Sequence, residues 1–366
     1  MIQLTLIPKA FGNPQRTTRC TMTHLPNFLL QSVVTTVSSW TVLCMILCVQ
    51  VTLEFSFGDV ARFVRHPWCV TECCTDEIWI NRSNSSGLQK ALKSQLFGQH
   101  LVTDHVVAAV EAHLTDKDPE RPLVLSFHGR TGTGKNYVAR MIAESIYKKG
   151  MNSKYVHHYA ANKHFAHEKR LDEYKSLLRS EVAAYTYSCP YQLFIFDEIE
   201  DMPEGLLDSL KPFIDYNVHL DNVDYRKAIF IFLSNTAAME ITQKTYSHLS
   251  AGGNREKITL QEMEEVIEKT AYSAKGAFNR SRLIDSYVIS HFVPFLPLER
   301  QHVRECVRVA LRKRSFSRRH MNDAIDQVMD LLQFWPEVSK LFALKGCKNV
   351  NEKAALVDHQ MRKTEL

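Results

Sequence analysis

The sequence lacks several patterns that mark whole classes of protein. No long basic run occurs in its 366 residues, and a formal charge of +5 is small for this length, so nucleic acid is not predicted as a partner. No guanine-reading motif is evident, which argues against a GTPase, and there is no internal repeat or long low-complexity segment. A composition of 45% apolar and 23% charged residues is ordinary for a globular protein. The length suits one large domain with a smaller second domain.

Charge is missing altogether from residues 26–53, which follow a basic, polar N-terminus, 1–25, without any acid. This apolar span exceeds the roughly 7–15 residues of a signal-peptide core and reaches the roughly 20 needed to cross a bilayer. A core helix of a soluble domain is the alternative interpretation. Upstream positive charge favours a cytosolic N-terminus, so the following chain would enter the lumen. A cleaved signal and a retained anchor both remain open, and Met22 is another possible start.

A cysteine-containing linker is predicted at 54–90. Its cysteines, Cys69, Cys73 and Cys74, have no partners at zinc-site spacing, so disulfides or structural thiols are expected instead of a metal site. Nine cysteines leave at least one unpaired within the chain. Asn81 and Asn84 begin glycosylation sequons, which fit a lumenal route.

A glycine-rich segment, 129–136, stands between a predicted strand at 123–128 and a helix with an apolar stripe. This is the context of a phosphate-binding P-loop, in which successive backbone N–H groups and the helix N-terminus face phosphate oxygens. The predicted nucleotide-binding residues are Gly129, Arg130, Thr131, Gly132, Thr133, Gly134, Lys135 and Asn136. Lys135 is expected to reach the β- and γ-phosphates.

Acidic and polar residues follow two further predicted strands. Asp197 and Glu198 follow the apolar run 193–196, and Ser234 and Asn235 follow the run 228–233. In a P-loop ATPase the first acid orients Mg²⁺ and the second polarises the attacking water. Asn235 is expected to hold that water or to touch the γ-phosphate. P-loops usually place Ser or Thr where Asn136 stands, so Asn136 and Asp197 are the predicted metal ligands, the former directly or through water.

The remaining pattern alternates helices and strands. The predicted segments are helices within 91–110 broken at 97–100, a strand at 155–159, helical stretches at 168–184 and 259–270, an extended edge or hinge at 291–298, helices at 303–311 and 321–332, and a polar tail at 351–366. The aromatic residues of 159–166 lack the glycine that usually accompanies a threading pore loop, and a surface loop is the favoured interpretation. We therefore expect an α/β fold, with a parallel sheet flanked by helices at 91–298 and a helical lid at 299–350.

The chain resembles the torsins, a lumenal family within the AAA+ ATPase superfamily. The resemblance is carried by the motifs at 97–101, 126–136, 195–198, 231–235, 292–298 and 346–348. Asn136 is the residue expected in torsins, and Cys347 beside Lys348 is similarly distinctive. The resemblance implies that Asp197 and Glu198 form Walker B, Asn235 is sensor 1 and Lys348 is sensor 2.

The resemblance also implies an activity and a setting. Torsins bind ATP with Mg²⁺ in the endoplasmic reticulum lumen and perinuclear space, and membrane-anchored lumenal partners activate them by supplying an arginine finger. They act in protein quality control, nuclear envelope organisation and lipid homeostasis. A homo-oligomer and protein clients are further expectations. Torsins are thought to pair the cysteines matching Cys306 and Cys347, so this disulfide is expected in an oxidising lumen. The alternative function is a nucleotide-gated binding or scaffold module with little hydrolysis.

Overall fold

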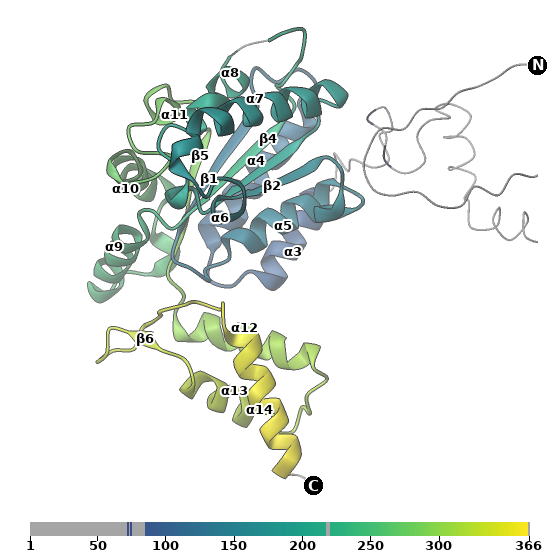
Figure 1. The fold of residues 1–366 in the computed structure, drawn as a ribbon. Helices are drawn as coiled ribbons and strands as arrows, with labels where there is room; N and C mark the ends of the chain where they lie inside the picture. The colour runs from purple at the N-terminus through teal and green to yellow at the C-terminus, as the bar shows by residue number, and fades with distance from the viewer. Residues whose placement is uncertain (1–71, 73, 75–84, 217–219, 365–366) are drawn as a thin grey trace, which may run out of the picture. The chain divides into compact units, whose positions relative to one another are not determined.

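The computed structural model describes residues 72, 74, 85–216 and 220–364, and Figure 1 shows the fold. The predicted N-terminus, 1–25, the apolar span, 26–53, and the sequons at Asn81 and Asn84 lie outside the described residues. Within the described part of the chain, no helix is both long enough and apolar enough to cross a membrane.

Five strands form one parallel sheet in the order β2-β3-β4-β1-β5. The strands are β1 (Leu123–Gly129), β2 (Val156–Ala160), β3 (Leu193–Asp197), β4 (Ile229–Ser234) and β5 (His291–Phe295). Parallel strands of one sheet end at the same edge, so the P-loop, Asp197 and Asn235 come together, as the sequence predicted. Pro294 lies in β5, which is an edge strand, where a missing N–H is tolerated.

The two faces of the sheet bury different kinds of side chain. Ile195 and Ile231 join an aliphatic cluster with α3, α4 and α5, whereas Phe194, Phe230 and Phe232 face an aromatic-rich cluster on the other side. Burial of each such side chain contributes about 1.5–3 kcal/mol. The helices of this core are α3 (Ser85–Gln95), α4 (His100–Thr115), α5 (Lys135–Ile146), α6 (Ala161–His164), α7 (Leu171–Ser188), α8 (Lys211–Ile214), α9 (Ala238–Ser250), α10 (Leu260–Ser273) and α11 (Arg282–Asp285).

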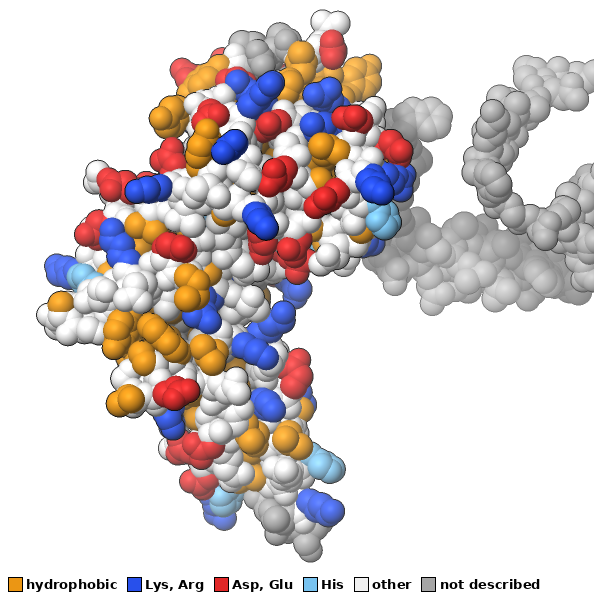
Figure 2. All heavy atoms as spheres, turned by 60° about the vertical axis from the view of Figure 1, so that its left-hand side comes forward, with side chains coloured by type: hydrophobic (Ala, Val, Ile, Leu, Met, Phe, Trp, Pro, Cys, Tyr) orange, Lys and Arg blue, Asp and Glu red, His pale blue; other side chains and the backbone are white. Residues whose placement is uncertain are grey.

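The lid has a third, smaller hydrophobic cluster of its own and follows β5 in the chain (Figure 1). Its elements are α12 (Arg300–Lys313), α13 (Met321–Asp330), β6 (Phe334–Trp335), β7 (Phe342–Ala343) and α14 (Val350–Thr364). Val338, in the loop between β6 and β7, is 99% exposed. Figure 2 shows several hydrophobic side chains gathered on one face of the described residues.

The predicted polar tail after residue 350 is wrong, because these residues form α14. Val350, Ala354 and Val357 are buried in the lid cluster, and Met361 packs against it. Their spacing of three to four residues places them on one face of a helix. The polar residues that suggested a tail are the exposed face of this helix.

The interpretation of 159–166 as a surface loop is wrong for Tyr159 and Phe165, whose rings are buried, although Asn162 and Lys163 between them are exposed. Tyr159 at the end of β2 is 8% exposed, and Phe165 just after α6 is 3% exposed. Their rings stack on each other, with centroids 6.1 Å apart, and Tyr159 also stacks on Phe196 of β3. These aromatic rings belong to the core.

Candidate functional site

All the predicted site residues except Gly129 and Arg130 line one cleft of about 450 Å³ between the carboxyl edge of the sheet and the lid. The core contributes the P-loop from Thr131 to Asn136, both Walker B acids and Asn235. The lid contributes Cys306, Lys313, Cys347 and Lys348. The sequence motifs therefore converge although they lie far apart in the chain.

Lys135 is the buried cation of this cleft. Its Nζ donates to the carbonyl oxygens of Gly129 at 2.6 Å and Arg130 at 3.2 Å, and to Asn235 Oδ1 at 2.9 Å. Burial lowers the pKa of Lys135 to about 8, although the carboxylates of Glu200 and Asp197 act to raise it. The three atoms that accept from this ammonium are all neutral oxygens, so phosphate oxygens, which carry charge, would be stronger partners for it.

The lid touches the P-loop at Gly132. Cys347 N–H donates to Gly132 O at 2.9 Å, and a Cβ at Gly132 would lie 2.0 Å from Lys345 O. Gly132 also has φ +81°, so glycine is required there both by conformation and by this close approach. Lys348 lies near enough for its charge to contribute to lowering the pKa of Lys135.

Asp197 and Asn136 form the predicted metal pair. Asn136 Nδ2 donates to Asp197 Oδ2 at 2.5 Å, and His158 Nε2 lies 3.6 Å from the same oxygen. Although burial raises the pKa of Asp197, hydrogen bonds from His158 and Asn136 leave it below its usual value, so the carboxylate is ionised at neutral pH. An ionised carboxylate and an amide oxygen are ligands that suit Mg²⁺, so these residues fit the predicted metal.

Glu198 is held in an unusual backbone conformation with φ 59°. Such a conformation is sparsely populated by residues other than glycine and is found at functional sites. The side chain accepts a hydrogen bond from Asn162 Nδ2 at 3.0 Å. Asn162 lies in α6, directly after β2, and therefore holds the predicted catalytic carboxylate.

Asn235 lies between Lys135 and a third acid, Glu200. Its Nδ2 donates to Glu200 Oε1 at 2.6 Å, while its Oδ1 accepts from Lys135. Thr131 Oγ1 also donates to Asn235 Oδ1, at 3.3 Å. Both the nitrogen and the oxygen of the Asn235 carboxamide are thus hydrogen-bonded.

Gln99 gives a structural reason for the motif at 97–101. Its side chain is 2% exposed, and its Nε2 donates to Thr133 O at 3.2 Å and Leu296 O at 2.8 Å. Leu296 N–H in turn donates to Gln99 Oε1 at 2.9 Å. Gln99 therefore ties the P-loop to the chain segment that follows β5.

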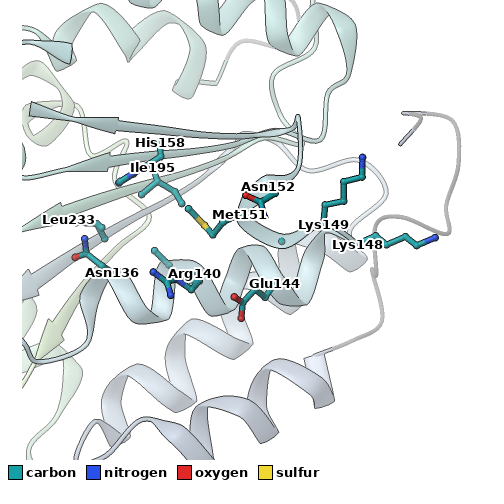
Figure 3. Close-up of a pocket in the computed structure, with 12 residues that line it drawn as sticks. Asn136, Arg140, Glu144, Lys148, Lys149, Met151, Asn152, His158, Ile195 and Leu233 are labelled. Atoms are coloured by element: carbon teal, nitrogen blue, oxygen red, sulfur yellow. The ribbon is translucent and has the colours of Figure 1, made fainter. Parts of the chain in front are cut away.

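A second cleft of about 570 Å³ lies beside the first, between α5 and the sheet (Figure 3). Asn136 and Leu233 line both clefts. Arg140 and Glu144 of α5 face Met151 and His158 across the second cleft. Because His158 also approaches Asp197, the surroundings of the metal-site carboxylate extend into this cleft.

Two disulfides are present among the described residues. Cys306 of α12 pairs with Cys347, as predicted, with a Cα–Cα distance of 6.2 Å. Cys74 pairs with Cys189 directly after α7, with Cα atoms 5.4 Å apart. The sequence suggested a disulfide for the N-terminal cysteine cluster but did not identify Cys189 as the partner.

Sequence reasoning missed Asn162, His158 and Glu200. Glu200 carried a visible signal, since it stands two residues after Glu198 in an acidic run. Asn162 and His158 carried a weaker signal, because they flank the end of a predicted strand whose neighbour ends in the Walker B acids.

Comparison with known proteins agrees with this geometry. The Torsin family profile matches residues 68–196, and the profile described as Torsin-1A, C-terminal domain, matches residues 298–356. A torsin-like protein of Caenorhabditis elegans is 42% identical over 286 residues, covering 78% of this chain and 80% of the relative. A torsin-like protein of Drosophila melanogaster is 38% identical over 300 residues, covering 81% of this chain and 88% of the relative.

Solved structures of Hsp104 are similar in fold. The complex of Hsp104 from S. cerevisiae with ADP gives a TM-score of 0.52 at 18% identity, and the closed state of Hsp104 with ATPyS and FITC casein gives 0.51 at 16%. The matches cover 77% and 76% of this chain but only 49% and 47% of the Hsp104 chains. At this identity the likeness concerns the fold alone. Together with the homologues, the parallel sheet, the P-loop and the lid identify the chain as a member of the torsin family, with the fold of AAA+ ATPases.

Proposed function

We propose that this protein binds ATP with Mg²⁺ and hydrolyses it, and that a membrane-anchored lumenal partner activates the hydrolysis. The observation that carries the proposal is the convergence of Lys135, Asp197, Glu198 and Asn235 on one cleft. Each has a role: Lys135 binds phosphate, Asp197 holds the metal, Glu198 accepts a proton from the attacking water, and Asn235 positions that water. The bound metal would supply charge stabilisation at the phosphates. Lys348 of the lid would contact the γ-phosphate.

The need for a partner is supported by the composition of the cleft. Its described lining includes Lys135, Lys313 and Lys348 but no arginine. An arginine supplied in trans stabilises charge in the transition state of phosphoryl transfer. A second molecule, either an activator or another copy of this chain, would supply such an arginine to the cleft.

The test is the variant Glu198→Gln, which removes the charge but keeps the shape. We expect ATP affinity close to that of the parent and turnover reduced by about a hundredfold or more, because a general base contributes about 10²–10⁴-fold. Turnover is measured with and without a torsin activator, and binding by titration calorimetry. A variant that turns over at the parent rate in the presence of the activator would show that Glu198 does not activate water.

A nucleotide-gated binding or scaffold module is the second candidate. It is favoured by the direct hydrogen bond from Asn136 to Asp197, which occupies one oxygen of the metal-site carboxylate. Binding of ATP without turnover, both alone and with activator, would support the module. Turnover only with the partner would support the ATPase.

We further propose that the protein works in the endoplasmic reticulum lumen and perinuclear space, associated with the membrane through residues 26–53. Two disulfides are consistent with an oxidising compartment. Its proposed tasks are remodelling and quality control of protein clients and nuclear envelope organisation. Protease protection of residues 85–364 in sealed microsomes tests the compartment, and N-terminal sequencing of the mature protein shows whether the span is cleaved.

A further inference from the structure

One carboxylate, that of Glu200, binds three donors from two consecutive residues at the end of β4. Ser234 Oγ donates to Oε2 at 2.9 Å, while Asn235 N–H and Asn235 Nδ2 donate to Oε1 at 3.1 Å and 2.6 Å. Charge-assisted hydrogen bonds of this kind are the stronger ones in proteins. Glu200 therefore holds both the backbone and the side chain of Asn235.

These contacts determine which way the Asn235 carboxamide faces. Its nitrogen donates to the Glu200 carboxylate, and its oxygen accepts from the Lys135 ammonium at 2.9 Å. The reverse orientation would set oxygen against a carboxylate and an NH₂ group against an ammonium, neither of which can form a hydrogen bond. The charges on either side therefore permit only one orientation.

Glu200 is itself held by the chain behind it. It lies in the short 3₁₀ helix Ile199–Asp201, and Ala277 N–H donates to Ile199 O at 3.1 Å. Gly276 packs so closely that a Cβ there would lie 2.4 Å from Glu200 O. The carboxylate that orients Asn235 thus has a supported backbone.

We infer that Glu200 is a positioning residue, which keeps the oxygen of the Asn235 carboxamide turned toward the phosphate end of the cleft. Asn235 then accepts a hydrogen bond from the attacking water and does not donate to the γ-phosphate. Lys135 and Thr131 both donate to that oxygen in this structure. When Lys135 turns to a phosphate, the lone pair that it leaves can accept from water. The inference rests on the ATPase function proposed above.

The test exchanges the Glu200 carboxylate and the Asn235 carboxamide, first one at a time and then together. Glu200→Gln lets the carboxamide of Asn235 rotate so that its oxygen and nitrogen exchange places. We expect kcat to fall by about a hundredfold, because a small misplacement of a catalytic group costs about that much in rate. ATP affinity should stay within about threefold of the parent. Asn235→Asp sets two carboxylates against each other, so its residual activity should rise as pH is lowered and they share a proton.

The double variant Glu200→Gln/Asn235→Asp restores the pairing with the two groups exchanged. The amide introduced at position 200 donates to the carboxylate introduced at position 235, and the second oxygen of that carboxylate faces Lys135. We expect this exchange to recover at least about tenfold, but not all, of the lost kcat and to remove the pH dependence, because the two side chains again pair a donor with an acceptor. Recovery is incomplete because the backbone N–H of residue 235, which donates to Glu200 Oε1 in the parent, loses that acceptor.

Asp201→Asn is the matched control, because it removes an exposed carboxylate one residue away and should keep the parent kcat. Parent turnover by Glu200→Gln, or a double variant no better than the worse single variant, would overturn the inference. If the parent chain itself shows no turnover with an activator, the proposed ATPase function is wrong. The orientation of the Asn235 carboxamide is then tested by thermal unfolding without nucleotide. The exchanged pair should then recover the melting temperature that Asn235→Asp loses, and failure to recover it would again overturn the inference.

Discussion

Lys135 shows how burial prepares a residue for its ligand. Its side chain is 7% exposed, and its pKa of about 8 results from burial that nearby carboxylates only partly offset. In the free protein the ammonium is therefore charged at pH 7 and loses its proton not far above. Phosphate oxygens stabilise the charged form, so ligand binding raises the pKa.

We expect ATP affinity to fall as the pH rises from 7 to 9, approaching about tenfold per unit above pH 8 if only the charged lysine binds. Binding near pH 8 should also take up protons. Calorimetric titrations in two buffers of different ionisation enthalpy measure both effects. A constant affinity with no proton uptake over this range would contradict the role of Lys135.

His128, directly before the P-loop, is a fully buried histidine. Its Nε2 lies 2.7 Å from Ser126 Oγ and its Nδ1 lies 3.2 Å from Thr236 O. Burial lowers its pKa to about 3, against a weaker effect of the hydrogen bond to Thr236. The ring is therefore neutral, with Nδ1–H donating to Thr236 O, and it links β1 to the end of β4.

The neutral ring makes the free energy of unfolding depend on pH. Between pH 6.5 and about 3 the unfolded chain binds a proton at His128 that the folded chain does not. The free energy of unfolding therefore falls by about 1.4 kcal/mol for each pH unit below 6.5 because of this residue. His128→Asn should flatten the pH dependence by that slope in urea unfolding between pH 6.5 and 4. Equal slopes for the parent and His128→Asn would refute the assignment.

At the scale of elements, the segment between β7 and α14 connects the lid to the P-loop. The disulfide joins Cys347 to α12, and Cys347 N–H binds Gly132 O. Reduction removes the covalent restraint on the residue that touches the P-loop and precedes Lys348. We therefore expect the position of Lys348 to depend on the redox state of this pair.

We expect reductant to change the affinity for ATP or ADP, and Cys347→Ser to remove that response. Peptide mapping under non-reducing conditions verifies the bond, and nucleotide titrations with and without reductant measure the effect. Cys74→Ser removes the other disulfide and should leave the response in place. A redox response that persists in Cys347→Ser would exclude this pair as its cause.

At the scale of the whole molecule, Arg255 joins three parts of the chain. Its side chain is 6% exposed, its Nη2 donates to Gly98 O at 2.6 Å, and its Nη1 donates to Glu299 Oε1 at 3.0 Å. Gly98 lies between α3 and α4, and Glu299 caps α12 of the lid. One buried ion pair thus connects the sheet domain to the first helix of the lid.

Arg255→Met should lower the free energy of unfolding by about 3–5 kcal/mol, because it leaves the Glu299 carboxylate without its partner. The double variant Arg255→Met/Glu299→Leu removes both charges and should regain most of that loss. Denaturant unfolding of the parent, the single and the double variant measures the coupling. A double variant as unstable as the single one would indicate that packing, not the unpaired charge, causes the loss.

Much of the fold and site could be predicted from the sequence because those features are local. The P-loop depends on consecutive residues between a strand and a helix, and each strand is indicated by a continuous apolar run such as 228–233. The parallel sheet then brings Asp197 and Asn235 to one edge. Helix α14 was equally local, since Val350, Ala354 and Val357 share one face, and its apolar stripe was overlooked among polar residues.

The sequence by itself therefore determined the strands, the P-loop and the residues at the strand ends, which result from short-range periodicity and backbone preference. Only the tertiary structure decided which partner each polar group has. Glu200 meets Asn235 because β3 and β4 are neighbours, Cys74 meets Cys189 across 115 residues, and Arg255 meets Glu299 at the start of α12. Such pairs leave no periodic signal in the chain, since their distance depends on how whole elements pack, and packing is a property of the assembled core.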